Sequence, residues 1–446
     1  MKASAVKYAV LSMVASLVVL TMVLMPFHAI LTVWTASIFG HYTLLRLWKE
    51  TLLFIAGLGV VYLMLTDRKI RTHTLSRRLV WLIAAYALLQ AAVGLIALHN
   101  NVVTPKALAY GWLLDLRFLV FFLVCWAVAL RTARLQSNWF KILVVPAAIV
   151  VGFGLLQIFV LPHDFLRHFG YSAATIDPVD TINKNNNYIR IFSTLRGPNP
   201  LGAYLILPIT VITAALLRSR RNWQLWALLV ASVIVLFFSR SRSALIGALL
   251  STAVLLLLSL RSRVAKQRLA VAGGVIVVVV ISLVLSLRHN STYQNLVLHT
   301  QTGTTATTSS NDGHVAALKN GLHDVAHQPL GRGAGTAGPA SIYNNHQSRI
   351  AENYFVQLAQ EVGILGLGLF LVINAGIGYL LWLRRTSPLA LCLFTSLIGI
   401  SVVNLLLHAW ADDTLAYVWW GLAGVAMATL PITPLADPVE VPIHEA

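Results

Sequence analysis

Charged residues are scarce in this chain of 446 residues: only 11% are Asp, Glu, Lys or Arg, whereas 58% are hydrophobic. A soluble domain carries about a quarter charged residues, so this composition excludes an ordinary soluble protein. The mean hydropathy of +0.76 indicates that the chain folds with a lipid bilayer as its solvent. We expect one integral membrane domain spanning residues 1–446.

Cysteines and recognisable cofactor motifs are also few. The two cysteines, Cys125 and Cys392, lie within apolar runs, which is typical of residues packed in a core. They do not indicate whether the protein resides in an oxidising or a reducing compartment. The chain has no Asp-x-Asp pair on the predicted outer side, no phosphate-loop motif and no His or Cys spacing typical of a metal site. A nucleotide-using or metal-dependent enzyme is therefore disfavoured, and we expect neither a metal nor a cofactor.

Runs of about twenty apolar residues, the length that crosses a bilayer as a helix, occur twelve times. They predict an all-α polytopic membrane protein with about twelve transmembrane helices. The apolar stretch 28–40 is short and is followed by basic residues, so we interpret it as interfacial or re-entrant. The predicted spans are 8–25, 50–66, 79–97, 112–130, 141–161, 200–217, 222–238, 242–260, 268–287, 353–383, 388–408 and 413–430.

The positive-inside rule orients these spans. Nineteen of the 33 Lys and Arg residues lie in short loops on the side that also holds both termini, which is therefore the cytoplasmic side. The net charge of +18 then reflects topology, and no nucleic acid is expected as a partner. Residues 288–352, between spans nine and ten, form a large, partly helical periplasmic loop that covers the active site, and residues 162–200 form a second periplasmic loop.

Arginines gather on the predicted outer side, where carboxylates are few and basic short-loop residues are disfavoured. Arg240 and Arg242 occupy a tight turn between two spans, and ionisable groups at such depth persist chiefly where they face a cavity or a partner. Guanidinium groups match phosphate oxygens in pairs, so converging arginines could hold a pyrophosphate; contact with membrane lipid headgroups is the alternative. Arg117 is expected to snorkel from the end of its span. The candidate arginines are Arg190, Arg196, Arg240, Arg242, Arg288, Arg332 and Arg349.

Two predicted helix starts carry further candidates. Asn199 followed by Pro200 has the pattern of a helix cap, and the positive end of that helix would face outward and suit an anion. Glu352 and Asn353 stand where the tenth span begins, so they either face the cavity mouth or cap the helix.

His314 lies in the first turn of a predicted helix, residues 313–327, and faces the polar loop. An imidazole titrates near neutral pH and is suited to taking a proton from a sugar hydroxyl. An ordinary loop histidine is the alternative, and His346 has a weaker claim to the same role. Nearby glycines either bring backbone amides to a phosphate or only form turns: Gly331, Gly333, Gly335 and Gly338.

The order of these motifs resembles the O-antigen ligase and polymerase superfamily, and within it most resembles the lipopolysaccharide core O-antigen ligases. The resemblance covers about residues 180–370 by motif and the whole chain by topology. The motifs are Arg190 ahead of Gly197-Pro198-Asn199, then Ser241-Arg242-Ser243-Ala244, Gly313-His314, Pro329-Leu330-Gly331-Arg332-Gly333 and Glu352-Asn353-Tyr354-x-x-x-Leu358-x-x-Glu361-x-Gly363-x-x-Gly366.

The resemblance implies transfer of O-antigen polysaccharide from undecaprenyl pyrophosphate to a sugar hydroxyl of lipid A-core, without metal or nucleotide, at the periplasmic face of the bacterial inner membrane. It implies that Arg190 and Arg242 bind the diphosphate and that His314 is the essential loop histidine. Many members have His before Asn where this chain has Glu352, so His314, His346 and Glu352 all stay candidate bases. A single in-line displacement would invert the anomeric centre.

Three other functions fit the same features. An O-antigen polymerase uses the same donor and differs only in its acceptor. A protein O-oligosaccharyltransferase would transfer the same glycan to a serine. A lipid or glycan transporter would place its binding site near the bilayer midplane, whereas the charged residues here gather at one face.

Overall fold

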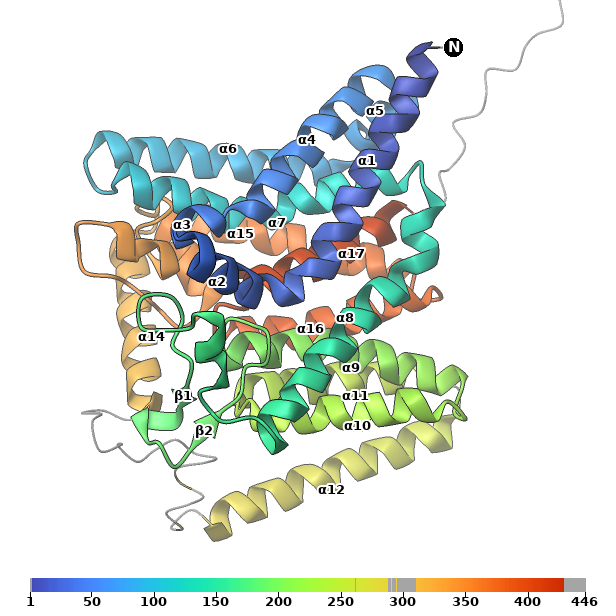
Figure 1. Cartoon of the computed structure of the whole chain (residues 1–446), viewed down its shortest axis with the longest axis vertical. Coiled ribbons are helices and arrows are strands. Elements are labelled where there is room, and N and C mark those ends of the chain that lie inside the picture. The colour runs from blue at the N-terminus through green and yellow to red at the C-terminus, as the bar shows by residue number, and fades with distance from the viewer. Residues whose placement is uncertain (1, 261, 288–289, 291–293, 295–309, 429–446) are drawn as a thin grey trace, which may run out of the picture.

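The computed structural model in Figure 1 describes residues 2–260, 262–287, 290, 294 and 310–428. Arg288 and most of the predicted loop up to residue 309 lie outside this range. The described part is almost entirely helical. One short antiparallel pair joins β1 (Asp180–Thr181) to β2 (Ile189–Arg190), with Asp180 opposite Arg190.

The helices follow the chain in this order. The N-terminal part comprises α1 (Lys2–Leu24), η1 (Met25–Phe27), α2 (His28–Phe39), α3 (Tyr42–Leu45), α4 (Trp48–Thr66), α5 (Arg68–Leu75), α6 (Arg78–His99), α7 (Pro105–Ala129) and α8 (Ala133–Phe159). After η2 (Phe165–Phe169) and η3 (Ile182–Lys184) come α9 (Pro198–Arg218), α10 (Trp223–Phe238), α11 (Arg242–Ser259) and α12 (Arg263–Leu287). The C-terminal part comprises α14 (Ser310–His327), η5 (Gly338–Tyr343), α15 (Tyr354–Leu383), α16 (Pro388–Asn404), η6 (Ala409–Ala411) and α17 (Asp413–Ala428).

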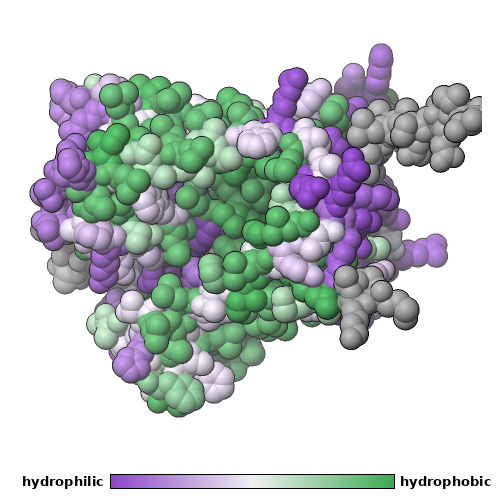
Figure 2. All heavy atoms as spheres, turned by 90° about the horizontal axis from the view of Figure 1, so that it is seen from above, coloured by the Kyte–Doolittle hydropathy of each residue, from purple (hydrophilic) through white to green (hydrophobic). Residues whose placement is uncertain are grey.

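Each of the twelve predicted spans coincides with one of these helices. Within the described residues, eight helical segments are long and apolar enough to cross a membrane, and α10 and α16 are shorter apolar helices. The first of the eight joins α1 and α2 into 35 residues, longer than one crossing needs. Figure 2 shows apolar side chains in a broad belt between hydrophilic side chains at two opposite ends. The chain is therefore a polytopic membrane protein.

The polar segments gather at one end of the bundle. In Figure 1, α14, β1 and β2 lie at the left, at the opposite end from the N-terminus. The starts of α7 and α15 belong to this end and are capped by side chains: Thr104 accepts a hydrogen bond from Ala107 N, and Asn353 from Val356 N. Asn199 does not cap α9 as predicted, because the helix begins at Pro198 with Gly197 as its N-cap.

The centre of the bundle is an aromatic core between α7 and α17. The rings of Phe118 and Trp420 lie 4.9 Å apart, and Trp410 packs against Trp420 at 5.5 Å. A Cβ atom on Gly424 would lie 2.4 Å from Phe122 O, so glycine at this position lets the two helices approach. Cys125 and Cys392 are both buried and free, as their apolar surroundings predicted.

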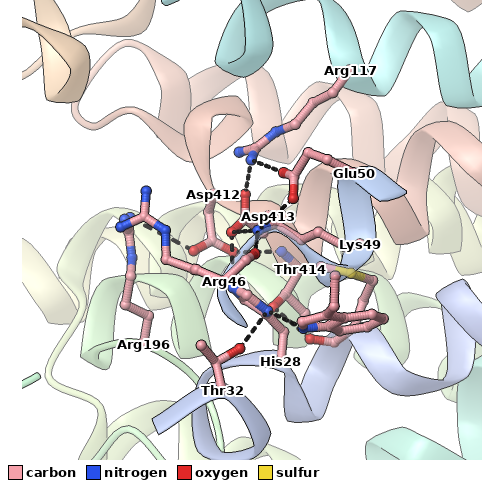
Figure 3. A network of polar contacts seen from close by, with 12 residues as sticks. His28, Thr32, Arg46, Lys49, Glu50, Arg117, Arg196, Asp412, Asp413 and Thr414 are labelled. Atoms are coloured by element: carbon pink, nitrogen blue, oxygen red, sulfur yellow. Dashed lines mark hydrogen bonds and ion pairs between the residues drawn. The ribbon is translucent and has the colours of Figure 1, made fainter. Parts of the chain in front are cut away.

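A buried cluster of charged residues, which we call the ion-pair cluster, joins α4, α7 and α17 (Figure 3). Arg117 forms ion pairs with Glu50 and Asp413, and its Nη2 donates to Ala411 O at 2.9 Å. Lys49 Nζ lies 3.2 Å from Glu50 Oε2 and 3.4 Å from Asp413 Oδ2. Arg117 is only 4% exposed, so the prediction that it snorkels is wrong. Its carboxylate partners come from helices far apart in the sequence.

His28 extends this cluster to α2. Trp48 Nε1, which can only donate, lies 3.1 Å from His28 Nδ1. His28 Nδ1 is therefore the acceptor, and Nε2 carries a proton toward Asp413 Oδ2 at 3.1 Å. The cluster thus ties four helices together through one carboxylate.

Loss of Arg117 should destabilise the fold. Arg117→Leu would leave Glu50 and Asp413 with less positive charge in a buried setting, and breaking such a pair typically costs about 3–5 kcal/mol. The measurement is thermal or denaturant unfolding of the detergent-purified protein. The matched control is Arg167→Leu, which removes an exposed pair with Asp164 and should change stability by about 1 kcal/mol or less. Equal stability of the two variants would contradict the assignment.

Candidate active site

A cavity of about 510 Å³ opens where the polar end of the bundle meets its apolar interior. We call it the arginine cavity. It brings together segments that are distant in the sequence, from β2 to the connection between α16 and α17. Its lining residues are Arg190, Asn199, Arg240, Arg242, Ser243, Ile246, Asn311, His314, Val315, Leu318, Glu352, Leu405, Leu406 and Leu407.

Arg190 is held in this cavity by two hydrogen bonds. Its Nε donates to Ser239 O at 3.0 Å, and its Nη2 donates to Asn199 Oδ1 at 2.6 Å. Asn199 therefore orients Arg190 instead of capping α9. Asp180, opposite Arg190 in the strand pair, is more distant, with 3.8 Å between Asp180 Oδ1 and Arg190 Nη1. Burial lowers the pKa of Arg190, with a further contribution from the positive charge of Arg242.

Arg240 and Arg242 flank the short turn between α10 and α11. Arg242 Nη2 donates to Asn311 Oδ1 on α14 at 2.7 Å. The Arg240 guanidinium lies over the rings of Phe237 and Phe238, at 4.9 and 5.2 Å. Its buried Nε has no hydrogen-bond partner among the described residues. Burial lowers the pKa of Arg240, so this side chain is held at the cavity wall against a desolvation cost.

Two residues of the cavity have left-handed backbone conformations. The φ angles of Arg240 and Glu352 are +55° and +53°. Non-glycine residues rarely adopt this region, and where they do the surrounding structure must hold them there. Such positions gather at functional sites, so the left-handed conformations of Arg240 and Glu352 favour a functional role for this cavity.

His314 and Glu352 face each other across the cavity. His314 Nδ1 lies 3.6 Å from Glu352 Oε2, which exceeds hydrogen-bond length but is within ion-pair distance. The two side chains are about one third exposed, at 38% and 34%. A substrate in the cavity can therefore reach them.

One wall of the cavity is apolar. Leu405, Leu406 and Leu407 follow α16, and Leu405 and Leu406 are about half exposed. Together with three arginines against one glutamate, this wall suits an amphiphilic anion: a negatively charged headgroup with an apolar chain.

The other predicted site residues lie elsewhere. Arg332, His346 and Arg349 line a second cavity of about 550 Å³. Arg196 Nη2 lies 3.8 Å from Asp412 Oδ2, beside the ion-pair cluster. Asn353 caps α15 and donates to Leu405 O at 2.9 Å. The single convergence of arginines predicted from the sequence is therefore divided among separate places.

The glycine-rich segment 329–335 packs against a break in α15. Gly331 and Gly363 both have positive φ, and Ile364 N donates to Pro329 O at 2.8 Å. The amides of Arg332 and Gly333 donate to the Gln360 and Glu361 carbonyls at 2.9 and 2.7 Å, and Gly335 N donates to the Glu361 carboxylate. These amides are occupied within the protein, which favours turn formation over phosphate binding.

His408 is a residue that the sequence reasoning missed. It is partly buried, and its desolvation together with the positive charges of Arg196 and His314 lowers its pKa to about 4. His408 is therefore neutral at physiological pH. Its Nε2 has no hydrogen-bond partner among the described residues. Its place after the Leu405–Leu407 wall carries no sequence motif that would have singled it out.

The fold and this cavity define a polytopic membrane protein with a cavity lined by arginines on one side and by leucines on the other. The family model described as O-antigen ligase matches residues 227–371, so this third of the chain is similar to the O-antigen ligase family. The matched region contains the Arg240–Arg242 turn, α14 and Glu352, whereas Arg190, Asn199 and the leucine wall lie outside it. No curated protein matches the chain.

The geometry predicts that the arginine cavity binds pyrophosphate. Replacing Arg190 or Arg242 by glutamine should weaken binding of inorganic pyrophosphate by about tenfold or more, since each charged hydrogen bond contributes about 1.5–3 kcal/mol. Calorimetric titration of the purified protein provides the measurement. The control is Arg385→Gln, an exposed arginine after α15. Equal losses in all three variants would point to nonspecific binding.

Proposed function

We propose that this protein is an O-antigen ligase: a glycosyltransferase that moves O-antigen polysaccharide from undecaprenyl pyrophosphate to a sugar hydroxyl of lipid A-core. The arginine cavity carries this proposal, because it combines paired guanidinium groups, an apolar wall and a histidine within one site. The family match supports the same class of lipid-linked substrate.

The donor fits the two halves of the cavity. Arg190, Arg240 and Arg242 neutralise the diphosphate, and the leucine wall receives the first part of the polyprenyl chain. A stabilised diphosphate is a good leaving group, so the arginines assist its departure without an acid. The reaction needs no metal when guanidinium groups supply the positive charge.

His314 is the base that this geometry favours among the three candidates. It lies in the arginine cavity, whereas His346 lines the second cavity. Glu352 acts as a positioning residue: it faces Nδ1 and stabilises the imidazolium that forms. This leaves Nε2 of His314 to accept the proton.

The transfer then proceeds as one displacement. The acceptor hydroxyl oxygen forms a bond to the anomeric carbon of the donor sugar while the bond from that carbon to the diphosphate oxygen breaks. The diphosphate leaves with the electron pair, and the hydroxyl proton passes to His314. Attack opposite the leaving group inverts the anomeric configuration.

Purified donor and lipid A-core test this proposal. Wild-type protein should transfer the glycan with inversion in the presence of chelator. His314→Ala should lower kcat by about 100-fold or more, the usual range of general-base catalysis. Glu352→Gln should lower it less.

Three outcomes would contradict the ligase assignment. Full activity of His314→Ala would exclude it as the base, and a product that retains configuration would exclude a single displacement. Transfer only to donor-linked glycan or to a protein serine would instead define a polymerase or an oligosaccharyltransferase.

The proposed orientation places the arginine cavity at the periplasmic face of the inner membrane and both termini in the cytoplasm. Single cysteines at the exposed positions Asn345 and Ser137 test it after Cys125 and Cys392 are replaced by alanine. A membrane-impermeant maleimide should label residue 345 in spheroplasts and residue 137 only after lysis. The reverse pattern would overturn the orientation.

A further inference from the structure

The helix α14 separates two cavities. Residues 311, 314, 315 and 318 line the arginine cavity, whereas residues 317, 320, 321 and 324 line the second cavity. These sets recur every three to four residues, so they occupy two faces of one helix. The segment 350–352 is shared in the same way: Ile350 and Ala351 line the second cavity, and Glu352 lines the first.

The second cavity has a different chemical character, and we call it the polar cavity. Its volume of about 550 Å³ is as large as that of the arginine cavity. Its wall carries several amides and hydroxyls, including Asn320, Thr336, Asn344, Gln347 and Ser348. Its larger apolar side chains are only Val102 and Ile350. Such a lining suits sugar hydroxyls better than a lipid chain.

Gln360 lines this cavity, and its side chain carries an unpaired acceptor. Its side chain is buried, at 5% exposure, and its Nε2 donates to Asp324 Oδ2 at 2.8 Å. Its buried Oε1 has no hydrogen-bond partner among the described residues. Buried polar atoms are rarely left without partners, so this oxygen points to a donor supplied by a ligand.

The polar cavity also holds an excess of positive charge. Arg349 Nη1 lies 3.4 Å from Asp324 Oδ2, the carboxylate that also accepts from Gln360. Arg332 is close enough for the positive charge of Arg349 to lower its pKa, after the larger effect of burial. Two guanidinium groups thus share one carboxylate.

Backbone hydrogen bonds hold both arginines in place. Arg332 N donates to Gln360 O at 2.9 Å, and Gly338 N donates to Arg349 O at 2.7 Å. Arg349 N donates to Ser341 Oγ at 3.1 Å. The segment after η5 and the glycine-rich segment before it therefore hold the backbone of both arginines beside the same cavity.

We propose that the polar cavity is a binding site for an anionic saccharide, a sugar that carries a phosphate or a carboxylate. Arg332 and Arg349 bind the anionic group, and the Gln360 Oε1 atom accepts a hydrogen bond from a sugar hydroxyl. This ligand goes beyond the diphosphate assigned to the arginine cavity.

The assignment of this saccharide to one of the two substrates rests on the proposed function. An in-line displacement brings the acceptor to the anomeric carbon from the side opposite the diphosphate. The polar cavity lies on the face of α14 away from the three arginines that hold the leaving group. We therefore assign it to the glycan of the acceptor.

Binding to the full chain in detergent tests the site without any transfer reaction. Glucose 6-phosphate and glucose serve as probes in calorimetric titration at millimolar concentrations. Glucose 6-phosphate should bind more tightly than glucose, and Arg332→Gln or Arg349→Gln should weaken its binding by about tenfold or more. Gln360→Leu should weaken binding of both sugars, because the hydroxyl acceptor is lost.

Two control variants show whether glucose 6-phosphate binds in the polar cavity. Arg167→Gln, an exposed arginine on the loop side, and Arg242→Gln should both leave glucose 6-phosphate binding unchanged. Retained binding of inorganic pyrophosphate in the polar-cavity variants would show that they fold. No saturable binding of glucose 6-phosphate to wild-type protein, or binding that depends on Arg242 but not on Arg332, would overturn the proposal.

The kinetics of glycan transfer then show whether the saccharide belongs to the acceptor or to the donor. Arg332→Gln should raise KM for the acceptor while KM for the donor and kcat stay nearly unchanged. A rise in donor KM alone would overturn the assignment to the acceptor. If wild-type protein binds glucose 6-phosphate through Arg332 but transfers no glycan, the proposed function fails and the saccharide site stands.

Discussion

Charged side chains among apolar helices must find either a counter-charge or an open, polar space, and this requirement shapes the whole structure. The protein meets it in two ways. In the ion-pair cluster, Lys49 and Arg117 are neutralised by Glu50 and Asp413, so the cluster is closed and serves stability. In the arginine cavity, Arg190, Arg240 and Arg242 instead line an open space of about 510 Å³.

One segment of the chain joins the ion-pair cluster to the arginine cavity. The chain between α16 and α17 contributes the leucine wall, His408 and Asp412, and it ends at Asp413, the central carboxylate of the ion-pair cluster. Asn353 Nδ2 holds Leu405 O while its own side-chain oxygen caps α15. The apolar wall of the cavity is therefore anchored at both ends by buried polar contacts.

The helix α14 organises the polar end of the molecule. It places His314 and Asn311 on the arginine cavity and Asp324 on the polar cavity, so a rotation of this one helix would alter both sites. Its position depends on the Arg242–Asn311 and Gln360–Asp324 hydrogen bonds. The two proposed substrates would thus be held on either side of a single helix, with the glycine-rich segment and the α15 break supporting the second site.

Several features follow from the sequence alone because they depend on local composition. Apolar run length predicts a polytopic, all-helical membrane protein, and the scarcity of carboxylates beside Arg190, Arg240 and Arg242 is the basis for the prediction of an anion site. Periodicity after Gly313 predicts α14 and puts His314 near its start. These signals lie within short stretches of chain, where side-chain chemistry and helix geometry act directly.

Other features were decided only by the tertiary structure, because they depend on which distant residues meet. Arg117 looks like a snorkelling residue until Glu50 and Asp413 from other helices surround it. Asn199 has the pattern of a cap, yet it hydrogen-bonds Arg190 because the α10–α11 turn brings that guanidinium to it. Arg332 and Arg349 carry the same charge as Arg190 and Arg242, and only the packing of α14 against the loop and α15 divides them between two cavities.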